Sequence, residues 1–592
     1  MGPSKRLHVV AAAFIWAAIS GVTTAVSLGP CPPLGPVLPA PVKPSADPDV
    51  QAAVKSFESS LTALTAGYNA SAVSVAVKSI HEDHPFFNFQ YTPPHLNTSG
   101  THKVDADTVY RIASISKLYT VLGVLLLDGV RMDDPVTKYL PQLRNLKREP
   151  GEPVNEITTP DWDEITLGSL ASHQSGIGSD MPLEISNSPG NWTDLGLPAL
   201  PENPGPDCGG SSILPPCSIS EFYRDFGKHH PVYGPFTSVV YSNVGIGILA
   251  LVIEAVSGKS FDDYIQETVL DPLGLNSTFP SRPPSDTKRG FIPDTTADRN
   301  WWDADFGPWF SAAGGFYTST NDFLTLGTAI LSHKLLTPAQ TRKWMKPKIA
   351  TSSAGLMLGE PWEIFRADNV TADGRLVEVY TKTGDIWGYD AAFCLVPDYD
   401  MVASILTGGF EAGSATTFRL CSDVVRELLP ALEKAGKAEA RAAMAGTYAD
   451  PATNSTLTLA VDESGGPGLS VTDWVVRGVN VSANYVNYAT MDGNFVEGLY
   501  APARLYPSGL KAGGQVSWRA HWDLNPPEAN AKLDAGYVWA GFHCITWAEL
   551  DRLIYKFNTL DDIVATVGEK DGVATSLDLR GFRVQLRRSS SS

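Results

Sequence analysis

The feature that most constrains the fold is an apolar helix that opens with a serine and a lysine three residues apart. The stretch RIASISKLYTVLGVLLLDGV contains Ser114 and Lys117, and its pattern predicts a buried helix from Ser116 to about Gly129. Positions i and i+3 share one helix face, so the Lys117 ammonium can reach the Ser114 hydroxyl. The helix N-terminus also favours negative charge, which helps a serine act as a nucleophile. The alternative interpretation is an N-cap serine beside a solvated lysine.

Ser-x-x-Lys alone is weak evidence, because it occurs three times. Ser285 lies in a Pro-rich polar stretch and Ser508 lies in a predicted turn, so only Ser114 stands at the start of an apolar helix. Two further motifs follow Ser114 in chain order. Tyr241-Ser-Asn opens a second predicted buried helix, and a single Lys-Thr-Gly at 382–384 ends a predicted strand. This order is that of the serine β-lactamases and penicillin-binding proteins.

From about residue 50 to 435 the chain resembles the β-lactamase-related serine hydrolase family, in its class C β-lactamase or penicillin-binding protein-like form. The likeness extends to residues 109–143, to ITLGSLASHQSGIG at 165–178 and to SAAGGFYTSTNDFLTL at 311–326. It implies an α+β fold, an α/β sandwich in which helices flank an antiparallel sheet, as in the β-lactamase/transpeptidase-like proteins.

The resemblance also implies roles for the motif residues. Ser114 would form an acyl-enzyme, while Lys117 and Tyr241 share the proton transfer, and which of the two is the base stays open. A cationic Lys382 favours the Tyr241 phenolate. His173 is expected to be structural. The expected substrate-binding residues, with the Ser114 and Asp385 N–H groups as oxyanion hole, are Asn243, Lys382, Thr383, Gly384 and Asp385.

Asp385 departs from the family pattern, which usually has a small polar residue after Lys-Thr-Gly. Penicillins and D-alanyl peptides bring a carboxylate to this strand, and Asp385 would repel it. Together with the bulky Trp387, this favours an ester, lactone or amide without a nearby carboxylate. The alternatives are an acyltransferase or cyclase of a secondary-metabolite pathway, a true β-lactamase or D-amino peptidase, and a non-catalytic ligand-binding protein on the same fold.

The chain divides into four parts. Residues 1–27 have the basic start and short apolar core of a signal peptide, although a single anchoring helix is the alternative. A Pro-rich leader follows at 28–49, then a hydrolase domain at 50–437 and an all-β domain at 444–592, loosely lipocalin-like. Within the hydrolase domain, 391–409 is expected to be one strand, and 178–236 is too long for a structureless loop.

Composition narrows the partners and the compartment. A net charge of −19 disfavours binding to nucleic acid or anionic membranes. The resemblance implies a small acyl substrate as the partner, and the oligomeric state stays open. Six cysteines and seven N-x-S/T sequons after a signal indicate a secreted glycoprotein. Cys208–Cys217 and Cys394–Cys421 are the expected disulfides, and neither a metal site nor a cofactor is expected. The sequons begin at Asn69, Asn97, Asn191, Asn276, Asn369, Asn454 and Asn480.

Overall fold

The computed structural model describes most of the chain from residue 31 to residue 589. The predicted signal peptide and Ser285 lie outside the described residues. The gaps within the described range are 181–189, 200–207, 209–214, 284–286, 294–300, 463–464, 492–502, 524–529, 531, 533–534, 539–540, 542–543 and 570.

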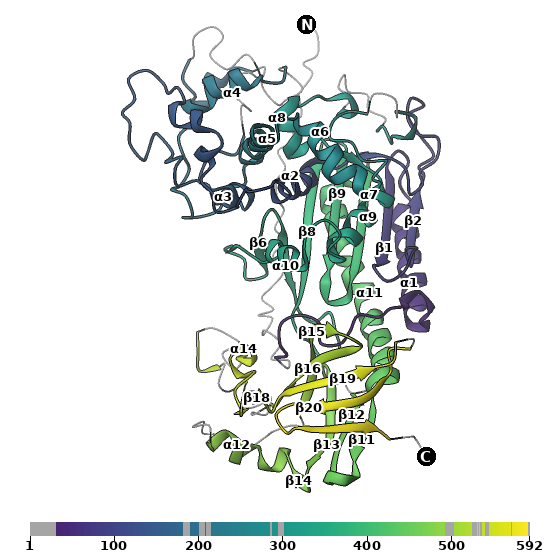
Figure 1. Ribbon diagram of the computed structural model, residues 1–592. Coiled ribbons are helices and arrows are strands. Elements are labelled where there is room, and N and C mark those ends of the chain that lie inside the picture. Colours follow the sequence, from purple (N-terminus) through teal and green to yellow (C-terminus); the bar gives the residue numbers. More distant parts are fainter. Residues whose placement is uncertain are drawn as a thin grey trace.

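An antiparallel sheet of eight described strands lies at the centre of the larger part of the molecule, in the order β2-β1-β10-β9-β8-β7-β6-β5 (Figure 1). Strands β9 and β10 are buried along their whole length because helices cover both faces of the sheet. The strands are β1 (Ala72–Ser79), β2 (Phe87–Tyr91), β5 (Ile349–Ala350), β6 (Leu356–Leu358), β7 (Glu363–Ala367), β8 (Val377–Ile386), β9 (Tyr389–Val396) and β10 (Met401–Gly408).

Side chains that alternate along each strand feed two separate cores. On β1, Val73, Val75 and Val77 face the core beneath α1 and α11, whereas Ala72 and Ala76 face the core that contains α2, α5, α8 and α9. The expected α/β sandwich with helices on both faces of an antiparallel sheet is therefore confirmed. These helices are α1 (Pro48–Thr65), α2 (Ser116–Leu125), α5 (Asn243–Ser257), α8 (Gly307–Gly314), α9 (Thr320–Leu331) and α11 (Gly413–Met444).

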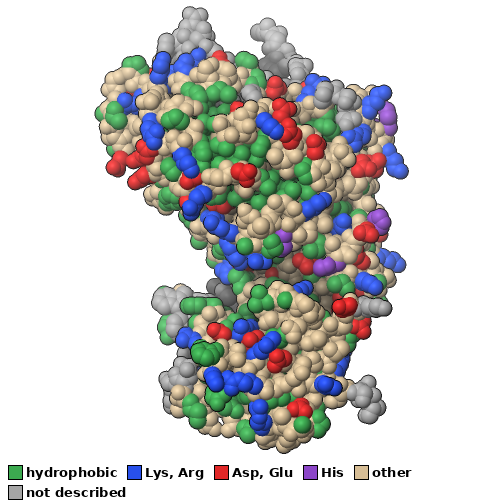
Figure 2. All heavy atoms as spheres, in the orientation of Figure 1, with side chains coloured by type: hydrophobic (Ala, Val, Ile, Leu, Met, Phe, Trp, Pro, Cys, Tyr) green, Lys and Arg blue, Asp and Glu red, His purple; other side chains and the backbone are tan. Residues whose placement is uncertain are grey.

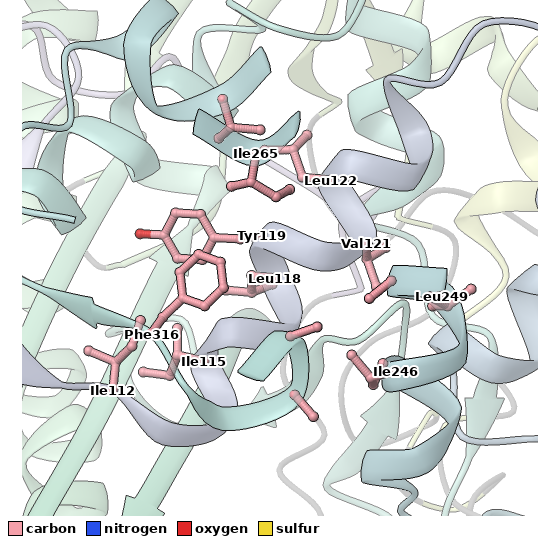
Figure 3. Packing of buried hydrophobic residues seen from close by; sticks show 14 of the residues in the cluster. Ile112, Ile115, Leu118, Tyr119, Val121, Leu122, Ile246, Leu249, Ile265 and Phe316 are labelled. Carbon is pink, nitrogen blue, oxygen red and sulfur yellow. The ribbon is translucent and has the colours of Figure 1, made fainter. Parts of the chain in front are cut away.

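Helix α2 lies inside the second core and has no solvent face from Ser116 to Val124. Figure 3 shows how its apolar side chains meet those of neighbouring elements. Tyr119 stacks on Phe316 with 4.8 Å between ring centroids. Burying one such large side chain contributes about 1.5–3 kcal/mol, so the neighbours of α2 fix its position strongly. Lys117 is carried into the interior with the helix, and the interpretation as a solvated lysine is wrong.

The C-terminal part is an antiparallel barrel. Its strands run in chain order around a ring that closes through pairing of β12 with β13, so eight described strands form an up-and-down barrel. The short strand β14 (Val479–Asn480) pairs with the end of β13. This agrees with the all-β, lipocalin-like expectation. The barrel strands are β11 (Gly446–Asp450), β12 (Ser455–Val461), β13 (Leu469–Val476), β15 (Arg504–Ala512), β16 (Gln515–His521), β19 (Asp562–Val567), β20 (Ala574–Leu579) and β21 (Val584–Arg588).

Helix α11 connects the two parts, and the Pro-rich leader packs beside it. Ala440 and Met444, near the end of α11, lie in the barrel core together with Val37 and Leu38 of the leader. Figure 2 shows a hollow between the barrel and the larger part at the left of the view. The two parts are thus joined through an uninterrupted helix and a shared core.

Three disulfides tie the described chain. The expected pairs Cys208–Cys217 and Cys394–Cys421 are confirmed. The third, Cys31–Cys544, links the leader to the C-terminal part across 513 residues of sequence. Such bonds are typical of proteins that fold in an oxidising compartment.

Two details differ from or refine the sequence-based expectations. The prediction of one strand over 391–409 is wrong, because a turn at Pro397–Tyr399 divides it into β9 and β10. The Pro-Asp-Tyr-Asp stretch at 397–400 interrupts the apolar run and is the turn signal that the prediction passed over. The described part of 178–236 carries the short helix α4 (Ile219–Asp225), which a capping box from Ser218 begins.

Among the described residues, no single helix is both long and apolar enough to cross a membrane, and the one pair that passes together, α5 with Phe261–Leu273, is bent by 78°.

Candidate active site

The turn that carries Ser114 is held in an uncommon backbone conformation. Residues Ala113–Ile115 form a single 3-10 turn that runs into α2, and Ala113 has a φ of 43°. A left-handed non-glycine residue is costly and is retained where the surrounding structure imposes it, often at functional sites. Here Ser116 Oγ donates to Ala113 O at 2.5 Å and accepts from Phe316 N at 3.0 Å. The Ser114 turn is therefore fixed against the segment that follows α8.

Lys117 is the closest charged partner of Ser114. Its Nζ lies 3.0 Å from Ser114 Oγ and donates to Ala313 O of α8 at 2.7 Å, and the side chain is fully buried. Burial lowers the pKa of Lys117 below its ordinary value, although Tyr241 opposes this. A buried amine with a depressed pKa can take up a proton from a neighbouring hydroxyl.

Tyr241 is placed by the start of α5. Ser242 is the N-cap, and its Oγ accepts from Gly245 N at 2.9 Å and donates to Gly178 O at 2.8 Å. The ammonium groups of Lys117 and Lys382 lie 4.8 Å and 5.4 Å from the centroid of the Tyr241 ring. Burial raises the pKa of Tyr241, but the two cations outweigh it and bring the pKa below the ordinary value.

His173 lies beside Tyr241 and accepts a hydrogen bond from the start of α5. The Ser242 N–H donates to His173 Nδ1 at 3.1 Å, and the imidazole lies 4.5 Å from the Tyr241 ring, centroid to centroid. Burial and the nearby cations lower the pKa of His173 well below its ordinary value, which keeps it neutral. These contacts hold Tyr241 and the start of α5 in place, and a structural role for His173 stays a prediction.

Strand β8 brings the Lys-Thr-Gly residues against the Ser114 turn. A Cβ at Gly384 would lie 2.1 Å from Ile112 O and 3.2 Å from Ser114 N, so only glycine allows this approach. Lys382 is buried, and Thr383 is half-buried beside it. Ser114, Lys117, Tyr241, Lys382 and Gly384, which are far apart in sequence, thus meet at one place.

Asn243 has a different partner from the expected one. Its Nδ2 donates to Asp180 Oδ1 at 2.6 Å, whereas the resemblance implies that Asn243 orients the substrate and Lys117. Asp180 also acts on Lys117 through its charge, which partly offsets the burial effect on the Lys117 pKa. No motif pointed to Asp180, since it lies just after the segment at 165–178 that resembles the family. The described residues include no cluster of three or more potential metal ligands.

Asp385 is exposed at the end of β8 and pairs in register with Asp390 of β9. Asp390 is only 5% exposed. Burial, with a smaller contribution from Asp385, raises the pKa of Asp390 to about 7. The strand edge beside Ser114 therefore carries one exposed carboxylate, with a second carboxyl behind it that titrates near neutral pH.

This arrangement predicts a pH-dependent stability. A carboxyl whose pKa is higher in the folded than in the unfolded state lowers the free energy of unfolding as the pH rises. The loss runs from the unfolded pKa, near 4, to the folded pKa of about 7. We expect the free energy of unfolding of Asp390→Asn, measured relative to wild type, to increase by about 2–4 kcal/mol as the pH is raised from about 4 to about 8. Urea denaturation at several pH values measures this. A difference that does not change with pH would contradict it.

The antiparallel sheet between helix layers, the internal helix α2 and the appended barrel define a β-lactamase/transpeptidase-like protein. A family model for Beta-lactamase matches residues 61–419, and the chain belongs to that family. Residues 436–590 match a second model, described as "Beta-lactamase-like-like, C-terminal domain". The chain is thus a member of a β-lactamase-fold hydrolase family.

Relatives of similar length are known. A "Beta-lactamase-like protein" of Arthroderma benhamiae is 28% identical over 96% of this chain and 98% of its own length. "Probable hydrolase clz13" of Cochliobolus lunatus is 23% identical over 87% of this chain and 85% of its own. A solved class C beta-lactamase aligns at 17% identity with a TM-score of 0.45, covering 65% of this chain and 96% of that one.

Proposed function

We propose that the protein is a secreted serine hydrolase that cleaves an ester, lactone or amide through an acyl-enzyme on Ser114. The observation that carries the proposal is the 3.0 Å contact between Lys117 Nζ and Ser114 Oγ beside Tyr241. Lys117 and Tyr241 both have pKa values below their ordinary ones, which favours the unprotonated forms that can take up the serine proton. Ser114 Oγ then attacks the acyl carbonyl, and the leaving group takes up the proton.

The remaining site residues act on the substrate in this proposal. The N–H groups of Ser114 and Asp385 would hold the developing oxyanion, where one donor is typically worth about 2.7–4 kcal/mol in the transition state. Lys382 maintains the positive potential that favours the Tyr241 phenolate. Asn243, fixed by Asp180, borders the site. Water then releases the acyl group by the reverse proton path.

Secretion is part of the proposal. The predicted signal, the three disulfides and the sequon positions support it. Six of the seven sequon asparagines are exposed and Asn97 is half-buried, so the acceptor amides are accessible for glycosylation.

The proposal is tested with two kinds of substrate. We expect p-nitrophenyl acetate and butyrate to be hydrolysed, and nitrocefin, which bears a carboxylate, to be turned over at least about 100-fold less efficiently in kcat/KM. A like charge at the site that makes the free energy of substrate binding less favourable by a few kcal/mol has this effect. Rapid nitrocefin turnover without ester cleavage would contradict the proposed substrate class and favour a true β-lactamase.

A further inference from the structure

A cavity of about 300 Å³ lies between two segments of the larger part that are far apart in the sequence. One wall comes from the segment at 143–162, and the other comes from 177–178 and 226–231. The two walls touch at Gly227, where a Cβ would lie 2.3 Å from Lys147 O. None of the described lining residues belongs to the candidate active site. The volume is that of a pocket for a small organic molecule.

Two residues that line this cavity each carry a buried polar atom without a partner. Among the described residues, Arg148 Nη1 and Thr159 Oγ1 are both buried and make no hydrogen bond. A buried donor that is left unpaired costs free energy, so such atoms call for a partner. A guanidinium only donates, and a hydroxyl can donate, so a ligand that carries oxygen acceptors would satisfy both groups.

Arg148 also brings a positive charge that the cavity wall does not neutralise. Arg144 Nε donates to Asp163 Oδ1 at 3.0 Å, and His230 Nε2 lies 3.0 Å from Glu152 Oε2. In the part of the chain that the structure describes, Arg148 forms no such ion pair, and none of the residues that line the cavity is acidic. The charge of the cavity therefore favours an anion.

The remaining wall is mainly apolar and aromatic. Trp162 and Phe226 are buried, with 6.4 Å between their ring centroids, and Leu143 and Ile177 are buried beside them. Such surfaces favour the apolar body of a ligand, while a few polar groups fix its orientation. The cavity thus combines apolar walls with one cation and one hydroxyl.

We propose that this cavity is a binding site for a small organic carboxylate with an aromatic or apolar body. Arg148 Nη1 and Thr159 Oγ1 donate to the carboxylate oxygens, and the apolar walls contact the body. One cation matches the single charge of a carboxylate, whereas a phosphate dianion would need a second one. The site is separate from the Ser114 cluster, and the inference does not depend on the proposed hydrolase function.

Isothermal titration calorimetry of the whole protein with 2-naphthoate tests the site. We expect a Kd below about 1 mM, and at least about tenfold weaker binding of the neutral 2-naphthamide. In Arg148→Met the affinity for 2-naphthoate should fall at least about tenfold, because the charge-assisted hydrogen bond is lost. In Thr159→Val it should fall about threefold. Neither atom has a partner in the free protein, so circular dichroism melts of both variants should match wild type.

The matched control is Arg342→Met. Arg342 is exposed on α10 (Pro338–Trp344) and does not line the cavity, so the Kd should stay within about twofold of wild type. A cavity that holds only water would give no saturable binding up to about 10 mM 2-naphthoate, which would overturn the inference. Binding that persists unchanged in Arg148→Met would place the probe elsewhere, for example at the Ser114 cluster, and would overturn it as well. Equal affinities for the acid and the amide would contradict the assignment of a carboxylate.

Discussion

Replacing Ser114 with alanine is expected to lower ester hydrolysis by about 10⁴-fold or more and to abolish labelling by a fluorophosphonate probe. Removing the nucleophile of a serine hydrolase leaves only the contribution of substrate binding and the oxyanion hole. Fluorescence of the labelled band after electrophoresis measures the probe reaction, and a p-nitrophenyl ester assay measures turnover. Circular dichroism melts check that the variant is folded, because Ser114 lies in a fixed turn.

Ser508→Ala provides a matched control. Ser508 belongs to another Ser-x-x-Lys match in the sequence, but it is exposed on β15 of the barrel. Its labelling and turnover should equal those of wild type. A folded wild-type protein that reacts neither with the probe nor with esters would point to the non-catalytic ligand-binding alternative. Labelling that persists in Ser114→Ala would place the reactive serine elsewhere.

The second large effect is expected at Arg375, in a buried ionic cluster beside α11. Its guanidinium donates to Asp373 Oδ2 at 2.7 Å, to Glu433 Oε2 at 2.8 Å and to Tyr399 OH at 2.6 Å, with 3% of the side chain exposed. Burial raises the pKa of Glu433, but Arg375 outweighs it and keeps the pKa below the ordinary value. Arg375→Met would leave the buried Asp373 without an ionic partner and Glu433 with only Lys437, 3.7 Å away, at a cost of about 3–5 kcal/mol.

Urea denaturation followed by tryptophan fluorescence measures this loss. Arg426→Met is the control, because Arg426 also pairs with an acidic residue on α11 but its side chain is 61% exposed. Exposed pairs contribute about 0–1 kcal/mol, so the control should differ little from wild type. Equal denaturation midpoints for the two variants would show that the buried cluster contributes no more than the surface pair.

The site residues that could be predicted from the sequence are those that belong to short local motifs. Ser114 and Lys117 are three residues apart on one helix, and Tyr241 directly precedes a capped helix, so short motifs identify them. The role of Gly384 could also be predicted, because a strand that closely approaches another backbone needs a residue without a Cβ. For these positions, the order of three short motifs along the chain indicated the site, because no single motif was specific enough.

Asp180 and Glu363 could not be found in the same way. Glu363 forms an ion pair with Lys382 only because β7 pairs with β8 in one register, and that register is set by the sheet as a whole. Asp180 meets Asn243 although 63 residues of sequence separate them, and no motif relates the two. The Cys31–Cys544 bond was also beyond prediction, since nothing local relates cysteines 513 residues apart. Contacts of this kind depend on tertiary structure.

The Cys31–Cys544 bond makes almost the whole molecule a covalent ring. Both the Ser114 cluster and the barrel up to β16 lie within this ring. A single cut of the backbone anywhere between the two cysteines opens the ring but releases no fragment until the disulfide is reduced. For the secreted hydrolase proposed above, in surroundings where proteases are common and reductants scarce, a nick between Ile177 and Phe222 would leave the Ser114 site and the barrel in one molecule.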